Sequence, residues 1–247
     1  MKRLLISQIF AAILFSPLCL AEMHEFKSAD GKKTMWAEVM GYDAETKQVN
    51  LKLANKKRIT SPATAFSKEG QEYIEKAAAL LEAGRNLRVE FEDVENLVSE
   101  KRNPTNGYQT LKQSNGFEVK VRNNGKSVFN GLKAEYQIFT SVYLDPFQDR
   151  PAKTDQIKYG TALFDALSPR NEIEISTETV PMTTIKRLPK SQCVGGTWST
   201  PATTFRGSRI DEMEGVIVRM TMDGKVVSEV KFPSNLTKEW DEDAAKS

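Results

Sequence analysis

The chain has 247 residues, of which 35 are Lys or Arg and 33 are Asp or Glu, so its net charge is close to zero. Nucleic-acid binding draws most of its affinity from a surplus of basic groups, and this balance predicts no nucleic-acid partner. The densest basic cluster, Lys56-Lys57-Arg58, is interpreted as the solvated end of a hairpin. With one histidine and two cysteines, the chain carries few nucleophiles, bases or metal ligands, and we predict a non-enzymatic protein without a cofactor.

Residues 1–21 have the pattern of an export signal. Lys2 and Arg3 give a positive start, residues 4–18 form a short apolar run, and Cys19-Leu20-Ala21 fits a small-x-small cleavage site. An uncleaved anchor needs about 20 apolar residues, more than this interrupted run provides. We therefore predict a signal peptide at 1–21, a mature chain that begins at Glu22 and is periplasmic or secreted, and no transmembrane segment after cleavage.

Cys193 has no intramolecular partner once Cys19 leaves with the leader, so no internal disulfide is expected. A nucleophilic thiol would need a base, and the one histidine, His24, lies on an N-terminus that we expect to be mobile. Free cysteine most often behaves as a small buried hydrophobe. We therefore interpret Cys193 as an apolar residue that enters a glycine turn.

Residues 22–66 alternate short strand-like runs with turn signals. Val49, Leu51 and Leu53 are separated by polar residues, as in a strand with one buried face. A further strand around residues 58–60 would complete a small barrel before Pro62. The pattern predicts a barrel of short strands over 22–66.

An amphipathic linker helix is predicted over residues 67–84. Ser67 is a favourable N-cap, apolar residues recur at helical spacing over residues 68–83, and Gly84 is expected to end the helix. Glu75, Lys76 and Glu82 are expected to face water.

The remainder, residues 85–240, has the alternation and turn chemistry of an antiparallel β-sandwich. Turns are predicted at Asn-Gly and Asp-Gly sequences, namely Asn106-Gly107, Asn115-Gly116, Asn123-Asn124-Gly125 and Asp223-Gly224. In the last hairpin, a three-residue loop over 223–225 would place Met222 opposite Val226 and Met220 opposite Ser228, which matches apolar faces. The polar tail, 241–247, is expected to be disordered.

Pieces of residues 26–74 resemble the SHD domain, an SH3-like homology module first described in the endocytic adaptor Sla and found in many secreted bacterial proteins. The similar pieces are Ser28-Ala29-Asp30-Gly31-Lys32, Ala37-Glu38-Val39, Val49-Asn50-Leu51-Lys52, Ala54-Asn55-Lys56-Lys57, Ile59, Pro62 and residues 66–74. The resemblance implies a non-catalytic barrel that binds a peptide or another protein. The β-rich remainder is similar to the Ig-like or fibronectin-like sandwiches attached to such modules. The expected fold is therefore mainly β: a small SH3-like barrel with one amphipathic helix, followed by an Ig-like antiparallel β-sandwich.

Two tryptophans are the candidate binding residues. Trp36 is either a ligand platform or, as we favour, part of the barrel core. Trp198, flanked by hydroxyl residues, either stacks on a sugar or protein ligand or folds back over the edge of the sandwich. Asp145, Asp149, Asp211, Glu212 and Glu214 are the acids that a hydrolase would use in pairs, and we favour solvated turns for the 211–214 group.

The sequence favours an exported, non-catalytic module that acts in protein binding or envelope assembly, with an unknown protein or peptide ligand, or a glycan. The alternative is an extracytoplasmic hydrolase or a carbohydrate-binding protein that uses loops of the sandwich. A third hypothesis, a periplasmic chaperone or an adhesin-like subunit, would require an unpaired apolar edge of the sandwich.

Overall fold

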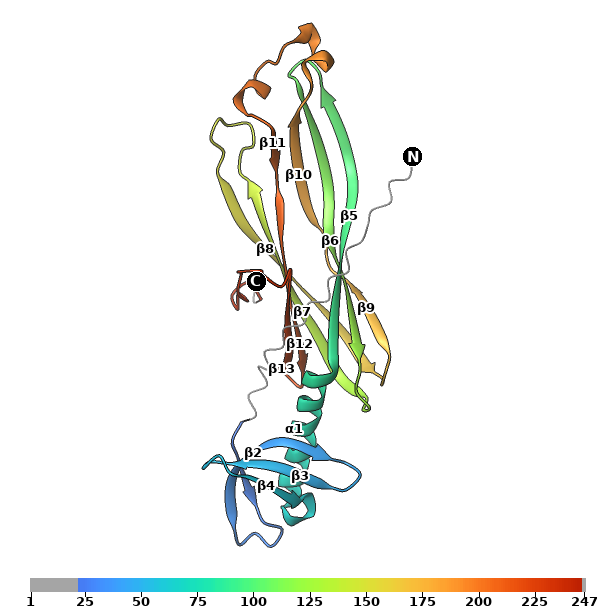
Figure 1. Cartoon of the computed structure of the whole chain (residues 1–247), viewed down its shortest axis with the longest axis vertical. Helices are drawn as coiled ribbons and strands as arrows, with labels where there is room; N and C mark the ends of the chain where they lie inside the picture. The colour runs from blue at the N-terminus through green and yellow to red at the C-terminus, as the bar shows by residue number, and fades with distance from the viewer. Residues whose placement is uncertain (1–21, 246–247) are drawn as a thin grey trace.

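The computed structural model describes residues 22–245, and over this range the protein is mainly β, with one α-helix and three open antiparallel sheets (Figure 1). The predicted signal peptide, 1–21, and residues 246–247 lie outside the described residues. No helix within 22–245 combines the length and the apolar character needed to span a membrane.

The N-terminal part is a four-stranded sheet in chain order. Its strands are β1 (His24–Lys27), β2 (Thr34–Asp43), β3 (Gln48–Leu53) and β4 (Arg58–Pro62), followed by the short 3-10 helix η1 (Ala63–Ala65). Val49 and Leu51 are fully buried, as the alternation predicted. The expected barrel is an open sheet in the structure, and α1 covers one of its faces.

Helix α1 (Lys68–Asn86) starts as predicted and ends later than predicted. The Ser67 hydroxyl accepts a hydrogen bond from the Gly70 amide at 3.3 Å, which confirms the N-cap. Gly84 does not stop the helix. A Cβ at this position would lie 2.8 Å from the carbonyl oxygen of Val227, so glycine is required because the helix touches a strand of the next sheet there.

Helix α1 belongs to two hydrophobic cores. Ile74 packs in the core of the N-terminal sheet, and Leu80 and Ala83 pack in the core of the following sheets. The helix passes into the strand β5 (Leu87–Asn103) without a loop. Glu82, predicted to face water, accepts hydrogen bonds from the Ser127 hydroxyl at 2.8 Å and the Lys126 amide at 3.4 Å. The helix therefore fixes the N-terminal sheet to the rest of the molecule.

Two further sheets pack against each other and form the long body of the molecule (Figure 1). One has the order β11-β10-β6-β5, with β9 also paired to β6, and the other has the order β13-β12-β7-β8. Their strands are β5 (Leu87–Asn103), β6 (Tyr108–Asn123), β7 (Phe129–Tyr143), β8 (Lys153–Leu167), β9 (Glu172–Ser176), β10 (Val180–Arg187), β11 (Ser208–Ile210), β12 (Glu212–Met222) and β13 (Lys225–Phe232). Between β10 and β11 lie the 3-10 helices η2 (Lys190–Gln192), η3 (Val194–Gly196) and η4 (Ala202–Thr204).

The predicted turn at Asn115-Gly116 is wrong, because both residues lie inside the continuous strand β6. At this point β6 exchanges its partner β10 for β9. The segment that joins β9 to β10 crosses here, and a Cβ at Gly116 would meet the Thr177 hydroxyl at 3.1 Å. Glycine is needed here because the crossing segment leaves no room for a side chain, and not because the chain turns.

The last hairpin combines the predicted register with a different loop. Met220 pairs with Ser228, Val218 with Val230 and Val216 with Phe232, as the apolar match required. The loop has two residues, Asp223-Gly224, with φ of 51° and 74°, and Met222 pairs with Lys225 instead of Val226. A shift of register between Met220 and Thr221 reconciles the short turn with the apolar pairing.

The described part of the tail, 241–245, makes specific contacts, contrary to the predicted disorder. The side chain of the fully buried Gln137 accepts from the Asp241 amide at 2.8 Å and donates to the Asp241 carbonyl at 2.5 Å. Arg219 pairs with Glu242 at 2.6 Å. The tail is therefore held on the outer face of the β13-β12-β7-β8 sheet.

Candidate functional site

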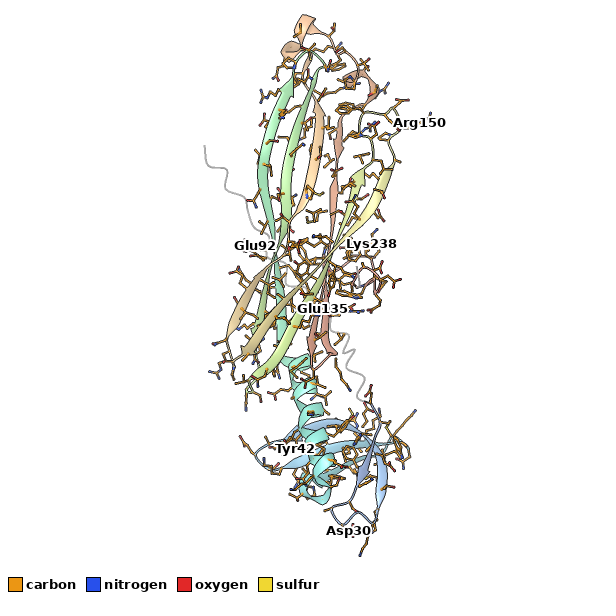
Figure 2. The ribbon with its side chains drawn as sticks, turned by 180° about the vertical axis from the view of Figure 1, so that it is seen from behind. Asp30, Tyr42, Glu92, Glu135, Arg150 and Lys238 are labelled. Atoms are coloured by element: carbon orange, nitrogen blue, oxygen red, sulfur yellow. The ribbon has the colours of Figure 1, made fainter. Side chains whose placement is uncertain are left out.

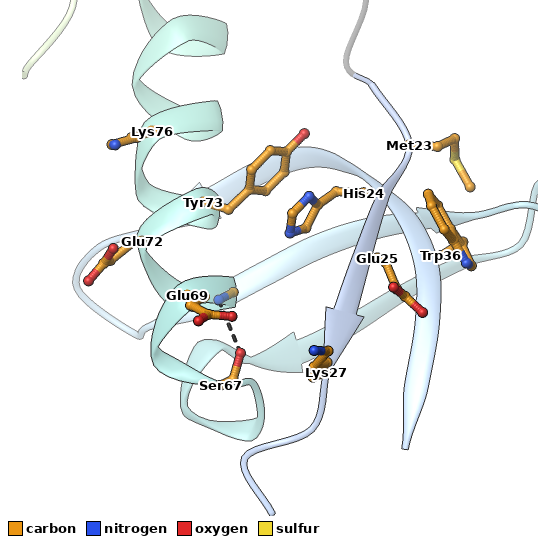
Figure 3. A pocket seen from close by; sticks show the side chains of 11 residues that line it. Met23, His24, Glu25, Lys27, Trp36, Ser67, Glu69, Glu72, Tyr73 and Lys76 are labelled. Carbon is orange, nitrogen blue, oxygen red and sulfur yellow. Dashed lines mark hydrogen bonds between the residues drawn. The ribbon is translucent and has the colours of Figure 1, made fainter. Parts of the chain in front are cut away.

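Trp36 lines a groove along the free edge of β1, and it lies on the side of β1 away from α1 (Figure 3). The groove has a cavity volume of about 500 Å³ and is lined by residues of β1, β2 and the first half of α1. The Trp36 side chain is 55% exposed. The interpretation that we favoured, a core position, is wrong.

Strand pairing explains why Trp36 faces outward. β1 and β2 place Glu25 opposite Trp36 and Phe26 opposite Met35. Partners in an antiparallel pair share a face, and successive residues alternate between faces. Because Phe26 and Ala37 are buried in the core, their neighbours Glu25 and Trp36 share the outer face. The sequence carried a signal for this exposure. Ala37 and Val39 are two residues apart and share the buried face of β2, so Trp36, which precedes Ala37, must lie on the opposite face.

His24 and Tyr73 form the wall of the groove near α1 (Figure 3). Their rings are stacked, with centroids 3.7 Å apart and planes at 8°, and the Tyr73 hydroxyl donates to the carbonyl of Glu22 at 3.3 Å. His24 thus lies in an ordered strand and not on the mobile terminus that we expected. Sequence reasoning also missed Tyr73, although its place beside Ile74 on α1 was a signal.

Burial shifts the ionisation of both rings. Desolvation lowers the pKa of His24 below its usual value, and the nearby Glu25 carboxylate partly opposes this shift. Desolvation likewise raises the pKa of Tyr73. Both rings are therefore neutral near pH 7, and they present an aromatic surface to the groove.

The free edge of β1 faces the groove with backbone groups. The Ser28 amide donates to the Lys33 carbonyl at 2.9 Å, so Glu25 and Lys27, at odd spacing from Ser28, direct their backbone groups away from β2. The Lys27 carbonyl accepts from the Ser67 amide at 2.9 Å. Glu25 directs its N–H and C=O to the same side, beside the stacked rings.

Charged side chains of both signs complete the groove. Glu25 and Lys27 come from β1, and Glu69, Glu72 and Lys76 come from α1. The arrangement offers an aromatic surface, a strand edge and ionic groups, which are the elements that bind an extended peptide. Within residues 22–245 no group of three or more His, Cys, Asp or Glu residues is placed to hold a metal ion.

Trp198 lies far along the molecule, at the segment between β10 and β11. Its indole N–H donates to the Leu188 carbonyl at 2.9 Å, and the Arg187 guanidinium and the Lys190 ammonium lie 4.3 and 4.9 Å from a ring centroid. This placement matches a tryptophan folded back over the edge of the sandwich. Cys193, also in this segment, is 9% exposed, and the two following glycines have φ of 67° and 63°. Cys193 thus precedes a glycine turn, as predicted, and it is buried, which the sequence left open.

Several of the candidate acids have structural partners. Asp211 accepts from the Tyr143 amide at 3.0 Å and from the Thr183 amide at 2.8 Å, and so it links the two sheets. The solvated turn that we favoured for residues 211–214 is therefore wrong: Asp211 binds backbone amides, and residues 212–214 lie in β12. Glu212 pairs with Lys153 at 2.9 Å and Glu214 with Lys238 at 3.0 Å, while the Asp145 carboxylate accepts from the Phe147 amide at 3.1 Å. Asp149 is exposed.

No family model matches the chain, and no curated protein matches it. A solved structure, the "X-ray structure of Northeast Structural Genomics Consortium target SoR45", is similar over 64% of this chain and 96% of that chain, with 9% sequence identity and a TM-score of 0.26.

Proposed function

We propose that the protein is an exported, non-catalytic protein-binding module that holds an extended segment of a partner protein in the groove along the free edge of β1. The observation that carries this proposal is the 55% exposed Trp36 beside that groove. A large aromatic side chain at an aqueous surface is a frequent anchor of protein recognition, because it buries much area at a small cost in conformational entropy.

The groove supplies each part of such recognition. An extended segment would pair with the N–H and C=O of Glu25, place an apolar or basic side chain over Trp36, and contact the stacked rings of His24 and Tyr73. Glu69 and Lys76 on α1 would favour segments with complementary charges. Main-chain pairing gives affinity here, and the side chains give specificity.

The fold that we propose for this unit is SH3-like, as the SHD resemblance implied, and the two-sheet body is proposed to be Ig-like. The open four-stranded antiparallel sheet followed by a single helix supports the first assignment. The two facing antiparallel sheets support the second. The leader at 1–21 supports a periplasmic or secreted location and a partner in the cell envelope.

The alternative, a hydrolase or a carbohydrate-binding protein that uses sandwich loops, has weaker support. It would use Trp198 as the sugar platform, but the indole is engaged by Leu188 and Arg187. It would also use Asp211, whose two carboxylate oxygens bind backbone amides. We therefore favour the binding module over catalysis.

The test is selection of peptides on the protein from residue 22 onward. Display of random peptides should enrich sequences that bind the wild-type protein, and Trp36→Ala should weaken that binding at least tenfold. Leu163→Ala is the matched control, since Leu163 is 78% exposed and lies outside the groove. If no peptide is enriched, or if Trp36→Ala binds as well as the wild type, the proposal is wrong.

A further inference from the structure

Charge is unevenly distributed in this nearly neutral chain. Residues 179–210 contain no Asp or Glu, and they contain Lys186, Arg187, Lys190, Arg206 and Arg209. The whole chain has 33 acids among its 247 residues, so a run of 32 residues without an acid is well below its average content of acids. We call residues 186–209 the basic tip.

The basic tip is the end of the molecule that is farthest from the N-terminal sheet (Figure 1). The loop between β7 and β8 lies at the same end, where Figure 2 labels Arg150. That loop adds little net charge, because Asp145 and Asp149 accompany Arg150 and Lys153. The excess of positive charge at this end comes from the basic tip and from the adjoining β5–β6 hairpin, where Lys101 and Arg102 outnumber Glu100.

The basic tip is held by contacts of Arg187 and Lys190 with the Trp198 ring, and three of its cations, Lys190 among them, are exposed. Arg187 donates to the carbonyls of Ala202 at 2.6 Å and Thr203 at 3.3 Å and lies over the Trp198 ring. Lys186, Lys190 and Arg206 are exposed. The exposed cations thus belong to a segment whose backbone is held by hydrogen bonds from Arg187.

An aliphatic side chain of the same segment is also exposed. Val194 is 64% exposed, although the next residue on its N-terminal side, Cys193, is buried. The Val194 amide donates to the Pro104 carbonyl at 3.0 Å, and Gly195 and Gly196 turn the chain immediately afterwards. Leu144, in the loop that follows β7, is 69% exposed. The fold thus holds an aliphatic group in water at a charged end.

We propose that the basic tip docks on the surface of an anionic phospholipid bilayer. Lys186, Lys190 and Arg206 match the negative head groups, and Val194 enters the boundary between head groups and acyl chains. A ligand bound by charge alone would not bury the exposed side chain of Val194. A membrane interface binds cations at its head groups and buries aliphatic groups below them. With the tip on the membrane, the groove at Trp36 lies at the opposite end of the body, where a partner can reach it.

The test is sedimentation of the protein from residue 22 onward with vesicles. Vesicles of phosphatidylcholine containing phosphatidylglycerol should bind the protein, and vesicles of phosphatidylcholine alone should not. Binding should weaken as salt increases, because salt screens the attraction. Each cation near such a surface contributes roughly a fivefold factor, so the triple change Lys186→Gln, Lys190→Gln and Arg206→Gln should weaken binding more than tenfold.

The matched control is the triple change Lys56→Gln, Lys57→Gln and Arg58→Gln, which removes the same charge from the exposed hairpin of the N-terminal sheet. This control should bind like the wild type, and Val194→Ser should weaken binding severalfold at unchanged charge. Equal binding to both kinds of vesicle, or equal losses in the two triple variants, would overturn the proposal. All substituted residues are exposed, and unchanged thermal unfolding establishes that each variant is folded.

Discussion

The rings of His24 and Tyr73 lie parallel, with their centroids 3.7 Å apart. One ring belongs to the edge strand β1 and the other to α1, so the stack fixes β1 against α1 and forms one wall of the groove. The stack involves the one histidine of the chain. The shape of the groove is thereby linked to an imidazole whose pKa is lowered by burial.

This stack predicts that the protein loses stability as pH falls below neutrality. Burial lowers the pKa of His24 in the folded state, so the unfolded chain, with a pKa of about 6.5, takes up the proton first. The contribution of His24 is therefore fully present above about pH 6.5 and is lost as pH falls through the lower pKa of the folded state. Urea unfolding at a series of pH values from about 5 to 7.5 measures this loss.

The control for this prediction is His24→Phe, which keeps an aromatic ring against Tyr73 and removes the titration. The difference in unfolding free energy between wild type and variant should change with pH in this window. A constant difference would contradict the account.

Gly84 allows α1 to touch β13. We expect Gly84→Ala to lower the unfolding free energy by about 1–3 kcal/mol, because the new methyl group would meet the Val227 carbonyl oxygen at 2.8 Å. Helix propensity alone predicts the opposite sign, a gain of up to about 1 kcal/mol. Chemical denaturation separates the two, with Gly41→Ala as control since no atom lies within 4 Å of a Cβ there. A stabilised Gly84→Ala variant would contradict the close contact.

Asp211 connects the two sheets through backbone amides of β7 and β10. Asp211→Asn replaces one accepting oxygen with an NH₂ group, so either the Tyr143 or the Thr183 amide loses its acceptor. We expect a loss of about 1–3 kcal/mol in unfolding free energy. Asp149→Asn, at an exposed position, should change it by less than about 0.5 kcal/mol. Equal effects in denaturant titrations would show that the bridge does not stabilise the fold.

Gln137 holds the C-terminal tail. Gln137→Ala removes both side-chain hydrogen bonds to the backbone of Asp241, and we expect residues 233–245 to become more sensitive to protease while the rest of the chain stays resistant. Limited proteolysis followed by mass spectrometry measures the rate of cleavage. Gln156→Ala, at an exposed position on β8, should leave that rate unchanged. If both variants are cleaved at the wild-type rate, the tail is held by other contacts.

The sequence predicted the elements whose cause is local. The alternation of Val49 with Leu51 and the capping of α1 by Ser67 depend on the period of a strand and on one side chain, and both are present. Gly84 and Gly116 were misread because their reason is a contact with a chain segment distant in sequence. The residues that flank a glycine in the sequence give no information about such contacts.

The candidate site was partly visible. Trp36 was identified, but its exposure depends on the pairing of β1 with β2, and the wall opposite depends on the packing of Tyr73 against His24. The absence of acids over 179–210 can be read directly from the sequence. Its meaning required the fold, which places this segment at one end of the molecule (Figure 1).

The most direct test of the central claim is an NMR titration of the protein with a peptide selected on it. The chain has three tryptophans, Trp36, Trp198 and Trp240, so three indole N–H signals report on three separate places. We predict that the Trp36 indole signal and the Glu25 amide signal shift in a saturable way, while the indole signals of Trp198 and Trp240 stay in place. Saturable shifts at Trp198 or Trp240, with Trp36 unchanged, would contradict the assignment of the groove as the binding site.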